Sequence, residues 1–219
     1  MNNNCPKQYL HLGGKPILQH TIERLCLPRI TKIVVCVAIN DPYWKTLTLP
    51  KSVLRVNGGV ERCHSVLNGL QVLREYAHPH DWVLVHDAAR PCVRTTDIEK
   101  LMSQLVNHPV GGLLATPARD TMKRTDNKSE QECQEVIETV NRSGLWHALT
   151  PQMFRLEALL SALQNVLNSG ELVTDDAQAM ERAGHKPVLV AGHLDNIKIT
   201  HPQDLSLAEL YLQQQACNS

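Results

Sequence analysis

The chain of 219 residues carries 22 lysines and arginines against 22 aspartates and glutamates, so its formal net charge is zero. This length suits one domain with a full hydrophobic core, and the charge balance excludes the global basic field with which proteins hold nucleic acid or an anionic membrane. None of the seven cysteines forms a C-x-x-C pair and no apolar run is long enough to span a bilayer, so we expect a soluble protein of the reducing cytoplasm.

Helix-like and strand-like patterns alternate along the chain. In chain order they predict a helix over 17–26, strands over 32–39 and 53–56, a helix over 66–77, a strand over 82–85, a helix over 98–105, a strand over 110–116, a helix over 156–167 and strands over 187–191 and 196–199. A closing helix should have Pro202 in its first turn and Leu205, Ala208 and Leu212 facing inward. This alternation is typical of an α/β fold with a doubly wound, mainly parallel sheet.

Residues 119–142 break this alternation. An acidic, Ser-containing middle at 126–135 lies between two β-compatible flanks, 121–123 and 136–140. We predict an extended hairpin arm that leaves the domain, with a disordered surface loop as the alternative. Because an isolated hairpin is only marginally stable in water, such an arm is expected to pack on a partner.

The segment His86-Asp87-Ala88-Ala89-Arg90-Pro91 follows the apolar run at 82–85 directly. Ligands of an open α/β sheet bind beyond the carboxyl ends of its strands, so Asp87 is well placed for metal-bound phosphates. The small alanines leave room for a ligand near the backbone, and Arg90 can bind a phosphate in bidentate fashion. The alternative is that Asp87 only caps the next turn.

Other segments carry possible binding groups. Gly58-Gly59-x-x-Arg62-x-x-Ser65 predicts a strand-to-helix turn that meets a flat ligand, although such a turn is often only a turn. Lys198 lies in an apolar run, where a charge is costly without an anion to pair it, whereas Lys7 beside Pro6 has a solvated lysine as its alternative.

Thr174-Asp175-Asp176 has the pattern of a helix start with Thr174 as the N-cap, and simple capping is the alternative to ligand contact. The histidines show no zinc-binding spacing, and no G-x-S-x-G motif supports a hydrolase.

Taken together and in this order, these segments resemble one family, the 2-C-methyl-D-erythritol 4-phosphate cytidylyltransferases of the non-mevalonate isoprenoid pathway. The resemblance covers essentially the whole chain. It rests on Cys5-Pro6-Lys7-Gln8-Tyr9, Gly58-Gly59 with Arg62 and Ser65, Val85-His86-Asp87-Ala88-Ala89-Arg90-Pro91, Arg119-Asp120-Thr121-Met122-Lys123-Arg124, Gly144-Leu145-Trp146-His147-Ala148-Leu149-Thr150-Pro151-Gln152 and Asp195-Asn196-Ile197-Lys198.

The resemblance implies a single Rossmann-like nucleotidyltransferase domain over 1–219, a homodimer formed through the arm at 119–142, and Mg²⁺ as cofactor. The implied substrates are CTP and a polyol phosphate. The implied catalytic residues are Lys7, Arg142 and Lys198; the nucleotide-binding residues are Gly58, Gly59, Arg62, Ser65, Asp87 and Ala88; the substrate-binding residues are Arg90, Thr121, Arg142, Thr150, Thr174 and Lys198; and the metal ligand is Asp87.

The chain departs from the family pattern at two places. Family members begin with a hydrophobic strand and a glycine-rich loop of the form A-A-G-x-G-x-R-M, and this chain has neither upstream of Met1. That strand is expected at the sheet centre, where burial of four side chains stabilises by about 6–12 kcal/mol, comparable to the stability of a whole domain. Val60, where some relatives carry an acid, leaves base selection to backbone groups.

Two alternatives to the methylerythritol enzyme follow. One is a CDP-ribitol-type cytidylyltransferase that acts on another polyol phosphate. The other is a catalytically impaired, truncated remnant, which the absent glycine-rich loop favours.

Overall fold

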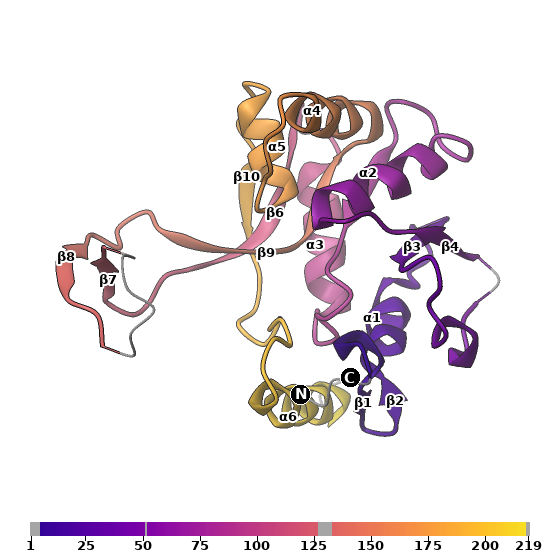
Figure 1. The fold of residues 1–219 in the computed structure, drawn as a ribbon, viewed down its shortest axis with the longest axis horizontal. Coiled ribbons are helices and arrows are strands. Elements are labelled where there is room, and N and C mark those ends of the chain that lie inside the picture. The colour runs from indigo at the N-terminus through magenta and orange to yellow at the C-terminus, as the bar shows by residue number, and fades with distance from the viewer. Residues whose placement is uncertain (1–4, 51, 127–132, 218–219) are drawn as a thin grey trace.

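The computed structural model describes residues 5–50, 52–126 and 133–217 (Figure 1). The strands are β1 (His11–Leu12), β2 (Lys15–Pro16), β3 (Ile33–Val37), β4 (Val53–Asn57), β5 (Trp82–Val85), β6 (Gly111–Pro117), β7 (Met122–Thr125), β8 (Val136–Val140), β9 (Trp146–Arg155) and β10 (Val188–Ala191). The helices are α1 (Ile17–Leu25), α2 (Arg62–Leu73), α3 (Thr95–Leu105), α4 (Leu156–Asn168), α5 (Asp176–Arg182) and α6 (Gln203–Cys217), with 3-10 turns η1 (Lys7–Tyr9) and η2 (Trp44–Thr46). Over these described ranges, no helix has the length and apolar character needed to cross a membrane.

The main sheet has the strand order β10-β6-β9-β5. β10 runs parallel to β6, and β9 runs antiparallel to both β6 and β5. Three of the four strands therefore point the same way, and β9 is the one that departs from the expected parallel direction. β3 and β4 form a separate parallel pair. The α/β class is confirmed, with a mixed main sheet.

Helices cover both faces of the main sheet, as a doubly wound fold requires. On one face α2, α4 and α5 share a buried cluster with sheet residues such as Leu113 and Phe154. On the other face α3 packs its buried Ile98 and Leu101 against Leu114. These helices have the apolar spacing that the sequence shows, because each one buries a single face against the sheet.

The arm is a hairpin that stands away from the body of the molecule (Figure 1). β7 and β8 pair in antiparallel register from Met122 opposite Val140 to Thr125 opposite Val136. The hairpin prediction is therefore confirmed. Residues 127–132, most of the acidic middle, lie outside the described residues.

The prediction of a strand over 196–199 is wrong. The segment is extended chain that belongs to no sheet. It is held by the Ile199 amide, which donates to the Ala89 carbonyl at 2.8 Å, and by the Asn196 side-chain amide, which donates to the Thr150 carbonyl at 2.8 Å. Its apolar side chains face a local cluster with α6, where Ala208 is fully buried, and this burial produced the strand-like pattern. α6 itself begins one residue after Pro202.

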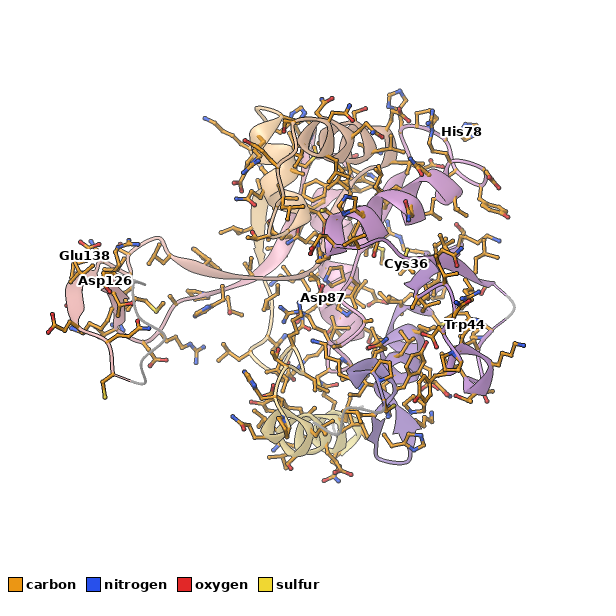
Figure 2. The ribbon with its side chains drawn as sticks, in the orientation of Figure 1. Cys36, Trp44, His78, Asp87, Asp126 and Glu138 are labelled. Carbon is orange, nitrogen blue, oxygen red and sulfur yellow. The ribbon has the colours of Figure 1, made fainter. Side chains whose placement is uncertain are left out.

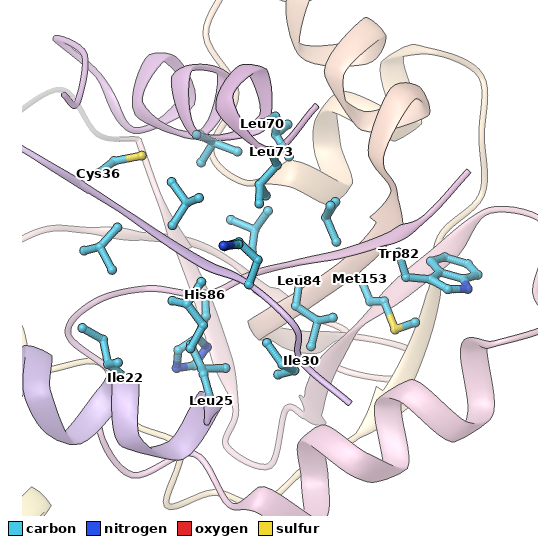
Figure 3. Close-up of a pocket in the computed structure, with 18 of the residues that line it drawn as sticks. Ile22, Leu25, Ile30, Cys36, Leu70, Leu73, Trp82, Leu84, His86 and Met153 are labelled. Atoms are coloured by element: carbon cyan, nitrogen blue, oxygen red, sulfur yellow. The ribbon is translucent and has the colours of Figure 1, made fainter. Parts of the chain in front are cut away.

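A cavity of about 650 Å³ separates β3 from β5 (Figure 3). α1 lines it with Ile22 and Leu25 on one side, and α2 lines it with Leu70 and Leu73 on the other. Where the chain is described, β3 pairs only with β4 and β5 pairs only with β9. Each of these strands therefore presents an unpaired backbone edge to the cavity.

The start of β6 depends on two adjacent glycines. A Cβ atom at Gly111, whose φ is +114°, would lie 2.1 Å from the Met153 carbonyl oxygen of β9. A Cβ atom at Gly112 would lie 2.1 Å from the Val188 carbonyl oxygen of β10. Backbones on both sides of β6 therefore approach more closely than a side chain allows.

We expect Gly111→Ala to lower the free energy of unfolding by about 3 kcal/mol or more, because overlap with β9 adds to the cost of a positive φ. Urea unfolding measures this loss. The matched control is Gly184→Ala, with φ +82° and no atom within 4 Å of the added Cβ, for which we expect only about 1–2 kcal/mol. Equal losses in the two variants would show that β9 tolerates the added methyl group.

Candidate functional site

Asp87 follows β5, and its carboxylate accepts hydrogen bonds from three cationic side chains. Arg62 Nε donates to Oδ1 at 3.2 Å, Arg90 Nε donates to Oδ2 at 3.2 Å, and Lys198 Nζ lies 3.1 Å from Oδ2. Asp87 lies in the body of the molecule, far from the arm residues Asp126 and Glu138 (Figure 2). Burial alone would raise the pKa of Asp87, but the charges of Arg62, Lys198 and Arg90 outweigh it and hold this pKa well below its usual range.

A chain of hydrogen bonds positions the Asp87 backbone. The Asp87 amide donates to Thr150 Oγ1 at 3.1 Å, and Thr150 Oγ1 lies 2.9 Å from His86 Nδ1. His86 Nε2 lies 3.1 Å from the Arg90 carbonyl oxygen. Burial lowers the pKa of His86 to about 4, so the ring is neutral at neutral pH. Since a carbonyl only accepts, Nε2 carries the proton and Nδ1 accepts from the Thr150 hydroxyl.

Arg62 also contacts a second carboxylate, that of Asp176 at the start of α5. Arg62 Nη1 donates to Asp176 Oδ1 at 3.2 Å, and Nη2 donates to Oδ2 at 2.7 Å. Only 1% of the Asp176 side chain is exposed. Burial raises the pKa of Asp176, and the Arg62 charge opposes that rise.

The sequence analysis did not select Asp176, and it placed the helix cap one residue too early. Asp175, not Thr174, is the N-cap, and its carboxylate accepts from the Gln178 amide at 2.9 Å. Aspartate is a stronger N-cap than threonine, which explains the shift. One signal pointed to Asp176: it lies four residues before the buried Met180 and therefore on the inward face of the helix.

The Gly58-Gly59 turn joins β4 to α2, as predicted. The Gly59 amide donates to Ser65 Oγ at 2.9 Å, and a Cβ atom at Gly59 would lie 2.3 Å from the His64 Cβ. The turn therefore requires glycine at this position. Val60 follows with 94% of its surface exposed. Ala88 is exposed beside Asp87, and its carbonyl accepts from Thr21 Oγ1 at 2.9 Å.

The structure thus brings Arg62, Asp87, Arg90, Thr150 and Lys198 together, although these residues are far apart in the sequence. Four other predicted site residues lie outside the hydrogen bonds that surround Asp87 in the described chain. Lys7 is in η1, Thr121 precedes β7, Arg142 follows β8 and donates to the Arg119 carbonyl, and Thr174 bonds Gln178.

The donor set around Asp87 fits a magnesium ion only in combination with substrate phosphates. In the described part of the chain, no group of three or more His, Cys, Asp or Glu side chains is gathered as a ready metal cage. Mg²⁺ is commonly held by one or two carboxylates together with phosphate oxygens and water. The single carboxylate of Asp87, surrounded by cations that attract phosphates, satisfies that requirement.

Comparison with known proteins supplies the family. The chain matches the family model described as 2-C-methyl-D-erythritol 4-phosphate cytidylyltransferase over residues 1–214. Proteins of that name from Aliivibrio fischeri (strain MJ11) and Vibrio cholerae serotype O1 are each 50% identical to it, over 97% of this chain and 88% and 90% of their own lengths. The crystal structure of the Francisella tularensis 2-C-methyl-D-erythritol 4-phosphate cytidylyltransferase has a TM-score of 0.83 and 36% identity, covering 95% of this chain and 94% of that one. The chain therefore belongs to the 2-C-methyl-D-erythritol 4-phosphate cytidylyltransferase family.

Proposed function

We propose that the site around Asp87 performs the cytidylyl transfer for which the family is named. The reaction joins CTP and 2-C-methyl-D-erythritol 4-phosphate, gives 4-diphosphocytidyl-2-C-methyl-D-erythritol and releases pyrophosphate, in the non-mevalonate route to isoprenoid precursors. The observation that carries the proposal is the convergence of Arg62, Arg90 and Lys198 on one carboxylate. Two phosphate-bearing substrates need such a concentration of positive charge.

The proposed chemistry is an in-line displacement at phosphorus. An oxygen of the methylerythritol phosphate attacks the α-phosphorus of CTP, and the bond from that phosphorus to the bridging oxygen breaks, so pyrophosphate leaves with the electron pair. No covalent enzyme intermediate forms, and catalysis consists of positioning and charge neutralisation. Lys7 stabilises the charge that develops at the α-phosphate, and Lys198 and Arg142 hold the attacking phosphate.

The remaining site residues bind the two substrates. The nucleotide is framed by Gly58, Gly59, Arg62, Ser65, Asp87 and Ala88, and the methylerythritol phosphate by Arg90, Thr121, Arg142, Thr150, Thr174 and Lys198. Asp87 is the protein ligand that would hold Mg²⁺ beside the triphosphate. When bound, this ion supplies positive charge that offsets the charge of the phosphates.

We further propose that residues 1–219 form one cytoplasmic nucleotidyltransferase domain whose arm at 119–142 forms a homodimer. The apolar side chains of the arm support this proposal, since Val136 is 56% exposed, Ile137 is 61% exposed and Met122 is 39% exposed. A two-stranded hairpin with such side chains needs a partner surface. In the dimer, Thr121 and Arg142 would serve the site of the neighbouring subunit.

The cavity between β3 and β5 is the proposed position of the hydrophobic strand that the resemblance implies. The carboxyl ends of both strands lie beside the start of α2, where Cys36 Sγ donates to the Ser65 carbonyl at 3.0 Å and Arg62 pairs with Asp87. The two strands therefore run in the same direction. One apolar strand of that direction would pair with both open edges and bury its side chains under α1 and α2.

Adding such a strand tests this position. We expect an extension in front of Met1, made of a five-residue Val/Ile/Ala strand and a glycine-rich loop, to raise the free energy of unfolding in urea by several kcal/mol, within the limit of about 6–12 kcal/mol for four buried side chains. The matched control has prolines at two central strand positions, which removes their hydrogen-bond donors. Equal stability of the two extended proteins would exclude the cavity as a strand position.

Lys198→Ala tests the proposed role of this lysine. Loss of one charged hydrogen bond to the attacking phosphate, about 1.5–3 kcal/mol, should slow turnover by roughly 10- to 150-fold. The fold should survive, because the Lys198 side chain is 41% exposed. Pyrophosphate release is measured in the chain itself and in its strand-extended form. Lys100→Ala, which removes a surface lysine bonded to the Ala191 carbonyl, should keep the parental rate, and unchanged turnover in Lys198→Ala would refute the assignment.

Subunit mixing tests the arm. Arg142→Ala and Lys7→Ala homodimers should each be inactive, because every composite site lacks one of the two cations. A heterodimer of the two variants should regain one intact site of its two, built from Lys7 of one subunit and Arg142 of the other. Co-expression with two different affinity tags isolates the heterodimer for assay. A purified heterodimer as inactive as its parents would mean that the arm serves its own subunit.

A further inference from the structure

Asp176 is a buried carboxylate that the proposed chemistry does not use. It lies at the first residue of α5, and its two oxygens accept from the two terminal nitrogens of Arg62 at 3.2 and 2.7 Å. The third nitrogen of the same guanidinium, Nε, donates to Asp87. One planar group therefore connects the carboxylate of the site to a carboxylate with 1% exposure.

This connection determines how Arg62 approaches Asp87. The guanidinium is rigid, and its N–H groups form a fork that fits a carboxylate in bidentate fashion. The fork is occupied by Asp176, so Asp87 Oδ1 receives a single N–H from the side of the group. Without Asp176, the fork would be free to turn toward Asp87 and pair with it in the bidentate geometry.

Asp176 is itself held by its neighbours in the chain. Gln152 of β9, 1% exposed, donates from Nε2 to Asp175 Oδ2 at 2.9 Å, and its Oε1 accepts from the Ala177 amide at 2.7 Å. These bonds attach the residues on both sides of Asp176 to the main sheet. A fully satisfied buried polar network of this kind keeps a side chain in one orientation.

We propose that Asp176 is a positioning residue for cation binding: it holds the Arg62 fork away from Asp87 and so leaves the Asp87 carboxylate available to a divalent cation. This inference rests on the proposed function, in which Asp87 holds the ion. It adds a residue that contacts neither substrate nor metal and acts through Arg62 alone.

The test is Asp176→Asn, which removes the charge and keeps the shape. Mn²⁺ binding to the protein in the presence of CTP is followed by water-proton relaxation, which does not depend on turnover. We expect the affinity for Mn²⁺ to fall by roughly tenfold, equivalent to about 1.4 kcal/mol, because a bidentate Arg62 now competes for Asp87. The Mg²⁺ concentration for half-maximal turnover should rise by the same factor. An affinity within twofold of the parent protein would overturn the inference.

Asp175→Asn is the matched control. It removes a negative charge from the adjacent residue, keeps a good N-cap and leaves Arg62 untouched. Its Mn²⁺ affinity should equal that of the parent protein, and a tenfold loss there would mean that any lost charge near α5 has the same effect.

Two further variants separate the possible failures. Asp87→Asn should itself weaken Mn²⁺ binding, and an unchanged affinity would refute the metal role of Asp87 rather than the role of Asp176. If Asp176→Asn does not fold, Arg62→Gln is compared with Arg62→Gln/Asp176→Asn, which leaves no unpaired buried charge. Because Asp176 acts through Arg62, the two proteins should bind Mn²⁺ equally, and a further tenfold loss in the double variant would overturn the inference.

Discussion

The charge of Asp87 is the constraint on which the site depends. A buried carboxylate remains ionised only when nearby cations compensate for its lost hydration. Here the compensation comes from Arg62 at the start of α2, Arg90 three residues beyond Asp87, and Lys198 in the extended segment before α6. The requirement for charge balance therefore brings three separate parts of the chain to the carboxyl end of β5. Asp176 extends the same balance to α5, since it compensates the additional positive charge of Arg62.

Neutral hydrogen bonds complete what the charges begin. The His86 ring links Thr150 of β9 to the Arg90 carbonyl, and Thr150 in turn accepts from the Asp87 amide. The backbone of the loop after β5 is thereby attached to the neighbouring antiparallel strand. This explains why β9, the one strand that opposes the direction of the main sheet, matters to the site: its residues Thr150 and Gln152 position the groups on either side of Arg62.

Two regions of the molecule leave apolar or backbone groups without burial in the single chain. The arm exposes apolar side chains on β7 and β8, and the cavity exposes one edge each of β3 and β5. Unpaired strand edges and exposed apolar patches both favour association with a further element of protein. For the arm that element is a second subunit in the proposed dimer, and for the cavity it is a strand.

The sequence by itself determined the parts of this protein that depend on neighbours along the chain. Apolar spacing was sufficient for α1 to α4, for the strands of the main sheet and for the arm hairpin, because local periodicity decides which face of an element is buried. The Gly58-Gly59 turn and the carboxylate after β5 were likewise readable from a few adjacent residues. The ordered motifs also identified the family.

Only the tertiary structure decided the features that depend on partners far away in the sequence. The antiparallel direction of β9 was one, since the sequence analysis did not assign a strand to that segment. The strand-like pattern at 196–199 reflects burial against α6 rather than sheet pairing, and the periodicity of an apolar run cannot distinguish the two. Asp176 was hidden for the same reason. Its partner, Arg62, lies 114 residues earlier, and a buried charge is recognised only when the residue that pairs with it is in place.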